Sequence, residues 1–119
     1  MLTIYTYANC DRCRAATRWL REQGVAFAER PIRETPPSLQ ELRAMRAALG
    51  GELHRLFNTS GRDYREMDLK RRLPSMSEAE ALTLLAGNGN LVKRPFVLGP
   101  GVAWVGFDAA AWGAALRSA

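Results

Sequence analysis

The feature that most constrains the fold lies at the amino terminus, where a strand, a helix and a second strand follow one another. Residues 2–7 (LTIYTY) are rich in β-branched and aromatic side chains and are typical of a strand. Apolar side chains then recur at helical spacing over residues 13–23, and residues 25–32 alternate weakly, as in a second strand. This order predicts two parallel strands joined by a right-handed crossover.

The middle of the chain is predicted to be helical. Ser38 followed by Glu41, and Ser77 followed by Glu80, each form the capping-box pattern that begins a helix. Apolar residues at helical spacing follow both patterns. Between the two helices, residues 52–73 fit short packed segments but show no single period.

A hairpin and a last helix complete the pattern. Residues 94–98 form a predicted strand that is entered through a proline. A Gly-Pro-Gly turn follows, and residues 103–106 then form the second strand of a β-hairpin. Asp108 can then cap a final helix. The whole order predicts an α/β fold of the thioredoxin-like kind, a mixed four-stranded sheet flanked by helices, with a helical insertion. We expect a single domain over residues 1–119.

The composition agrees with one soluble domain and argues against several function classes. The chain has 119 residues, of which 47% are hydrophobic and 24% charged. Because no apolar run approaches the ~18 residues of a membrane helix, and the amino terminus reads as a strand rather than a signal peptide, we expect a cytoplasmic protein without a membrane partner. The net charge of +5 is interpreted as a solvated surface. The basic run Lys70-Arg71-Arg72 has no interleaved aromatic residues, so direct binding to nucleic acid is not expected.

The motif Cys10-Asp11-Arg12-Cys13 stands where the first strand leads into the first helix. The unpaired N–H groups and the dipole of a helix start favour a thiolate at that position. Arg12 and Arg14 can add positive charge, whereas Asp11 opposes it. In a reducing compartment, paired cysteines are more often catalytic or metal-binding than structural. We therefore predict that Cys10 is a nucleophile.

Cys13 follows Cys10 by three residues, which places both on one helix face. Cys13 is thus within reach to attack a mixed disulfide on Cys10, as a resolving cysteine does. It can equally be a small buried hydrophobic residue. A zinc site needs four ligands, and two cysteines with the distant His54 do not supply them within one chain. We expect no metal, except one shared between two chains, and we expect His54 at the surface.

Four stretches of the sequence resemble the arsenate reductase (ArsC) and Spx family of thioredoxin-like proteins, and most closely its YffB-type branch. In chain order they are residues 5–15 (YTYANCDRCRA), 34–38 (ETPPS), 56–61 (LFNTSG) with 64–67 (YREM), and 91–95 (LVKRP) with 105–107 (VGF). The resemblance implies that Cys10 is the nucleophilic cysteine. It also implies that Arg94 lies beside Cys10, to hold an oxyanion or to favour the thiolate, and that Pro95 follows a cis peptide bond.

The sequence departs from the family's arsenate reductases at two positions where those proteins carry further arginines. The residues here are Asn58 and Phe107. Each charge-assisted contact is worth about 1.5–3 kcal/mol, so the loss of two should weaken the binding of a doubly charged arsenate. The residues expected to bind a substrate are Asn9, Arg12, Arg14, Asn58 and Pro95.

Two functions follow from the resemblance. The first is a thiol-dependent oxidoreductase that binds no cofactor and takes glutathione as co-substrate or glutaredoxin as partner. Its catalytic residues would be Cys10, Cys13 and Arg94. The alternative is an Spx-like transcriptional regulator that binds the RNA polymerase α subunit and is switched by a Cys10–Cys13 disulfide.

Overall fold

The computed structural model describes residues 1–118, which form two compact units. We call the first the sheet unit; it consists of Met1–Pro31 and the segment from Arg94 onward. We call the second the helical unit; it is Ile32–Lys93. No helix within the described residues combines the length and the apolar character needed to cross a bilayer.

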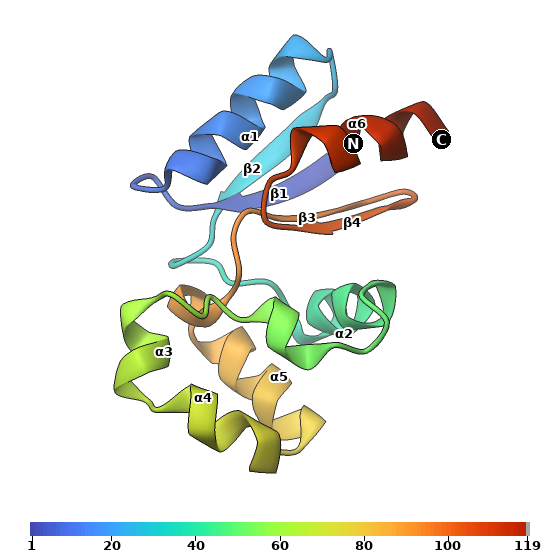
Figure 1. Cartoon of the computed structure of the whole chain (residues 1–119). Coiled ribbons are helices and arrows are strands. Elements are labelled where there is room, and N and C mark those ends of the chain that lie inside the picture. The colour runs from blue at the N-terminus through green and yellow to red at the C-terminus, as the bar shows by residue number, and fades with distance from the viewer. Residues whose placement is uncertain (119) are drawn as a thin grey trace. The chain divides into compact units, whose positions relative to one another are not determined.

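Four strands form the sheet in the order β2-β1-β3-β4 (Figure 1). The parallel pair is β1 with β2, in a register that sets Ile4 opposite Glu29. The antiparallel pairs are β1 with β3 and β3 with β4. The predicted mixed four-stranded sheet is therefore confirmed, with the hairpin at one side. The strands are β1 (Leu2–Thr6), β2 (Phe27–Pro31), β3 (Phe96–Gly99) and β4 (Val102–Val105).

Helices α1 (Asp11–Glu22) and α6 (Ala109–Ser118) contribute to one core with the sheet (Figure 1). The carboxylate of Asp108 accepts a hydrogen bond from the backbone N–H of Ala111 at 3.1 Å, which confirms the predicted cap of the last helix. Since Ile4 pairs with Val97 and both belong to this core, the two helices cover the same face of the sheet. The buried core residues are Leu2, Ile4, Ala16, Leu20, Val97 and Trp112.

The buried face of α1 follows the predicted helical spacing only in part. Of the apolar residues Ala15, Ala16, Trp19 and Leu20, Ala16 and Leu20 are buried and Ala15 and Trp19 are half-buried, while Cys13 and Thr17 are buried as well. A buried threonine is tolerated because its hydroxyl lies 3.1 Å from the carbonyl oxygen of Arg14 and 3.2 Å from that of Cys13, where it can donate. The helix is thus turned so that Cys13 points inward.

The helical unit begins its two long helices where the sequence predicts. Ser38 Oγ accepts a hydrogen bond from the N–H of Glu41 at 3.1 Å, and the Glu41 carboxylate accepts one from the N–H of Ser38 at 3.0 Å. Ser77 and Glu80 repeat this capping box. The ambiguous segment between them forms short helices. The elements are α2 (Leu39–Ala48), α3 (Arg62–Glu66), α4 (Leu69–Arg72) and α5 (Glu78–Gly87), with the 3₁₀ segments η1 (Leu53–Leu56), η2 (Leu73–Ser75) and η3 (Gly89–Leu91).

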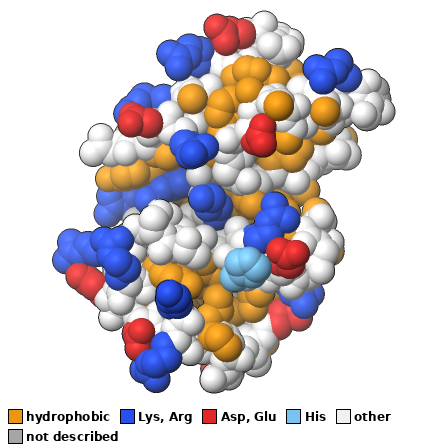
Figure 2. All heavy atoms as spheres, in the orientation of Figure 1, with side chains coloured by type: hydrophobic (Ala, Val, Ile, Leu, Met, Phe, Trp, Pro, Cys, Tyr) orange, Lys and Arg blue, Asp and Glu red, His pale blue; other side chains and the backbone are white. Residues whose placement is uncertain are grey.

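Charged side chains of both signs are interleaved on the face shown in Figure 2. Within the basic run on α4, Arg71 pairs with Asp68 at 2.5 Å, and Arg72 donates to the carbonyl oxygen of Met67 at 3.0 Å. Both guanidinium groups therefore have local partners around the short α4. Such exposed pairs contribute little to stability.

Gly89 lies where the two ends of the helical unit approach each other. A Cβ atom at this position would stand only 1.8 Å from the carbonyl oxygen of Ile32. The backbone there is held in place, because the Asn88 side chain donates to Asp63 at 3.0 Å and accepts from the N–H of Asn90 at 3.0 Å. Only glycine fits this contact.

We expect Gly89→Ala to lower the free energy of unfolding by about 1–3 kcal/mol or more, as overpacking of a fixed contact does. Gly87→Ala is the matched control, because its added Cβ would meet no atom within 4 Å at the end of α5. That variant should be neutral or more stable by up to about 1 kcal/mol. Urea denaturation followed by circular dichroism measures both. Equal stabilities of the two variants would contradict the close contact.

Candidate redox site

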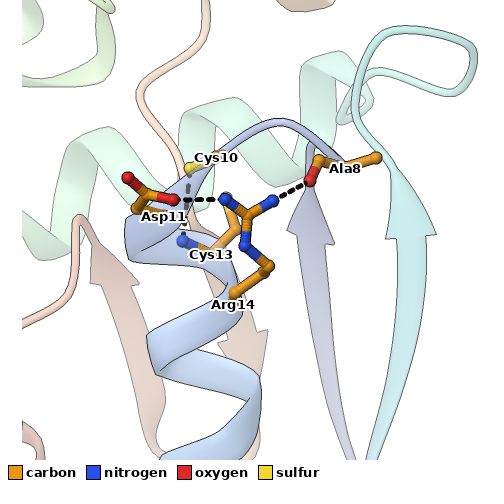
Figure 3. Close-up of polar contacts among 5 residues, drawn as sticks. All are labelled: Ala8, Cys10, Asp11, Cys13 and Arg14. Atoms are coloured by element: carbon orange, nitrogen blue, oxygen red, sulfur yellow. Dashed lines mark hydrogen bonds and ion pairs between the residues drawn. The ribbon is translucent and has the colours of Figure 1, made fainter.

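Cys10 is the N-cap residue of α1. Its backbone is extended (φ −123°, ψ 110°), and the helix begins at the next residue. Its Sγ accepts a hydrogen bond from the backbone N–H of Cys13 at 3.2 Å (Figure 3). A side-chain oxygen usually fills this role. A thiolate accepts such a bond better than a thiol, and the helix dipole favours its charge. Because Cys10 is only half-buried, a reactant can reach this sulfur.

Cys13 differs from Cys10 in its surroundings. Its side chain is 2% exposed, and burial, above all, raises the pKa of the Cys13 thiol from 9.0 to about 12. A hydrogen bond to the Cys10 side chain raises this pKa too, whereas the backbone N–H of Tyr7 and the charge of Arg94 lower it. Cys13 therefore keeps its proton at neutral pH. Of the two free cysteines, Cys10 is the one placed to react first.

Arg94 and Pro95 stand directly before β3. The peptide bond between them is cis, which confirms what the resemblance implied. The guanidinium carbon of Arg94 lies 5.0 Å from the ring centroid of Tyr7, within cation–π reach. Its Nη1 is buried and has no hydrogen-bond partner among the described residues. The Tyr7 ring therefore contacts this cation, whose charge acts on Cys13. The placement of Arg94 beside Cys10, which the resemblance implied, stays a prediction.

The side chains of Arg12 and Arg14 are bonded to neighbouring backbone and carboxylate groups. Arg14 forms an ion pair with Asp11 and also donates to the carbonyl oxygen of Ala8 (Figure 3). Arg12 donates to the carbonyl oxygen of Phe107 at 3.2 Å. The Arg14 contact links α1 to the turn before it, and the Arg12 contact links α1 to the loop after β4. The charge of Arg14 is offset by Asp11, so its expected effect on the sulfur is reduced.

The remaining predicted residues are divided between the two units. Asn9 is exposed in the turn before Cys10. Asn58 belongs to the helical unit, where its backbone N–H donates to the carbonyl oxygen of Leu91 at 2.7 Å. His54 is exposed, as expected. Within residues 1–118, no group of three or more His, Cys, Asp or Glu side chains could hold a metal ion.

Sequence reasoning did not single out Tyr7. This residue follows β1 and precedes the cysteine turn, and it contacts both Arg94 and Cys13. The available signal was a large aromatic side chain at the end of a predicted strand, next to a reactive motif. That signal is weak, because aromatic residues are common in strands.

The model of the ArsC family matches residues 5–115. The chain belongs to the ArsC family. The match includes both cysteines, Arg94 and Pro95, and all of the helical unit. The resemblance carried by the four sequence stretches is therefore confirmed.

Two known proteins align with most of this ArsC-family chain. The uncharacterized protein YusI of Bacillus subtilis is 47% identical over 106 residues, which cover 89% of this chain and 90% of YusI. The global transcriptional regulator Spx of Enterococcus faecalis is 29% identical over 108 residues, which cover 91% of this chain and 80% of Spx.

Solved structures of the family share the fold. A Bacteroides fragilis protein described as related to the ArsC family superposes with a TM-score of 0.89 at 37% identity, covering 96% of each chain. A structure named YffB protein superposes with a TM-score of 0.82 at 28% identity, covering 98% of this chain and 99% of that one. The predicted thioredoxin-like fold is confirmed by these neighbours.

We expect a native alkylation experiment to separate the two cysteines. Iodoacetamide at neutral pH should label Cys10 and leave Cys13 unlabelled, because Cys13 is buried and its pKa is raised to about 12. Below that pKa the rate of Cys13 labelling should rise about tenfold per pH unit. Peptide mass spectrometry measures both sites, and labelling in urea is the control. Equal native rates at the two sites would contradict this assignment.

Proposed function

We propose that this ArsC-family chain is a thiol-dependent oxidoreductase that reduces small disulfides, with glutathione or glutaredoxin supplying the electrons. The observation that supports it best is the 3.2 Å hydrogen bond from the Cys13 N–H to a reachable Cys10 Sγ at a helix start. This arrangement favours a thiolate. Reduction of a disulfide by glutathione or glutaredoxin suits a reducing compartment, and we propose the cytoplasm as the location.

In the first step the Cys10 thiolate attacks one sulfur of a small disulfide. A bond forms between Cys10 Sγ and that sulfur, the original S–S bond breaks, and the departing thiolate takes a proton from solvent. Cys10 is then part of a mixed disulfide. Because Cys13 is buried and protonated, it does not compete as the attacking group.

The second step releases the remaining half of the substrate. Either Cys13 loses its proton to solvent and attacks Cys10 Sγ, or a glutathione thiolate attacks Cys10 Sγ; in both cases the substrate sulfur leaves as a thiolate. The glutathione route leaves a disulfide between glutathione and Cys10, and a second glutathione thiolate attacks the glutathione sulfur, which releases glutathione disulfide and the Cys10 thiolate. The first route leaves a Cys10–Cys13 disulfide, which two glutathione molecules or a reduced glutaredoxin return to the dithiol state. In each route two electrons pass from thiols to the substrate disulfide.

Arsenate is a less suitable substrate than a disulfide. The positions that correspond to two anion-binding arginines are Asn58 and Phe107. The Phe107 ring instead packs against Trp112, with ring centroids 4.9 Å apart. Arg94 is the remaining cation, and one cation holds a doubly charged oxyanion less tightly than three.

Turnover should depend on Cys10. With glutathione, glutathione reductase and NADPH, the purified protein should reduce hydroxyethyl disulfide. Cys10→Ser should lower the rate to the uncatalysed level, because the remaining thiol, Cys13, is buried and protonated at neutral pH. NADPH consumption followed by absorbance measures this. Arsenate in place of the disulfide should give a slower rate.

The matched control is Cys13→Ser, which keeps Cys10 and its helix cap. If glutathione resolves the mixed disulfide, this variant retains turnover; if Cys13 resolves it, turnover falls while Cys10 still forms the mixed disulfide. Equal rates for the unmodified protein and Cys10→Ser would overturn the proposed activity.

A second candidate is an Spx-like regulator. It is favoured by the 29% identity to Spx over 91% of this chain and by the cysteine pair, which can switch between dithiol and disulfide. In this function the chain would bind the RNA polymerase α subunit.

A pull-down with the purified α subunit distinguishes this candidate from the enzyme. The regulator should be retained in one redox state and weakly in the other, and Cys10→Ser should remove the difference. Absence of retention in both states eliminates this function.

A further inference from the structure

Tyr7 touches two parts of the redox site at once. The guanidinium carbon of Arg94 lies over its ring, 5.0 Å from the ring centroid. The backbone N–H of Tyr7 bonds to the Cys13 sulfur and favours the charged form of that sulfur. Tyr7 therefore contacts both the cation and the buried thiol, although Tyr7 and Arg94 are far apart in the sequence.

The contact with Tyr7 matters because part of the Arg94 guanidinium is buried without a polar partner among the described residues. The unpartnered atom is Nη1. By contrast, Arg12 donates to the carbonyl oxygen of Phe107, and Arg14 forms an ion pair with Asp11. A long arginine side chain without such bonds needs a packing surface to keep one orientation, and an aromatic face provides it.

We infer that Tyr7 is a positioning residue for the thiol chemistry: its ring orients the Arg94 guanidinium so that the positive charge acts on the Cys13 sulfur. The inference rests on the proposed function for its relevance to turnover. It does not concern a substrate contact, since the ring acts through Arg94.

The step that depends most on this orientation is resolution by Cys13. Cys13 must give its proton to solvent before its sulfur attacks Cys10 Sγ, forming the Cys10–Cys13 bond and releasing the substrate thiolate. Burial and the Cys10 side chain oppose that loss, whereas Arg94 and the Tyr7 N–H favour it. The nearby charges of Asp11 and Arg14 offset each other in an exposed pair. An Arg94 that turns away would leave the Cys13 thiolate less stable.

The test uses Cys13 as the single thiol, in a Cys10→Ser background, so it does not require catalytic activity. Tyr7→Leu removes the ring but keeps the backbone N–H, and Tyr7→Phe keeps both. Tyr7→Leu should slow the iodoacetamide labelling of Cys13 by about threefold at each mildly alkaline pH, the change that roughly half a pKa unit produces. Tyr7→Phe should label at the rate of the parent protein.

A double-mutant cycle with Arg94→Gln separates positioning from packing. If Tyr7 acts through Arg94, Tyr7→Leu slows labelling only when Arg94 is present and adds nothing to Arg94→Gln. Equal effects in both backgrounds, faster labelling at every pH, or an unchanged rate would overturn the inference. Should Tyr7→Leu fail to fold by circular dichroism, Tyr7→Met supplies a flexible side chain without a ring.

Turnover with intact Cys10 then distinguishes this inference from the proposed function. If Cys13→Ser shows that Cys13 resolves the mixed disulfide, Tyr7→Leu should lower disulfide reduction in the glutathione assay while Tyr7→Phe retains it. Absence of turnover in the parent protein would overturn the enzyme proposal yet leave the labelling cycle to decide on Tyr7. Normal turnover with no effect of Tyr7→Leu in either assay would refute the positioning role alone.

Discussion

The hydrogen bond from the Cys13 N–H to Cys10 Sγ is the interaction on which the site depends. It requires a helix that begins immediately after a strand and a short turn, with a sulfur in place of the usual capping oxygen. The packing of α1 on the sheet fixes that helix start in space. The chemistry of Cys10 is thus a consequence of how the first strand and the first helix pack.

The two sulfurs differ in accessibility because the fold leaves Cys10 half-buried and buries Cys13. Cys10 precedes the helix in extended conformation and stays within reach, whereas Cys13 lies on the inward face of α1 with Thr17. Burial raises the pKa of Cys13 to about 12 and so keeps its proton at neutral pH. In the proposed reaction, this difference alone is enough to make Cys10 the sulfur that attacks first.

The parts of the structure that local sequence determines were predictable. The capping boxes at Ser38 and Ser77 involve residues three apart, and the helix start at the cysteine motif follows from the strand and turn before it. Contacts between distant residues were not predictable, since no local pattern encodes them. Tyr7 with Arg94 and Arg12 with Phe107 are such contacts. The burial of Thr17 was missed because a polar side chain is satisfied there by its own helix.

The approach of Gly89 to the carbonyl group of Ile32 also bears on how this architecture can change. Because these residues stand near the first and last positions of the helical unit, the chain leaves that unit close to where it entered. A segment with adjoining ends can lengthen, shorten or be exchanged without pulling on the polypeptide outside it. The helical unit is thus an insertion between β2 and β3, two strands that flank β1 and do not pair with each other.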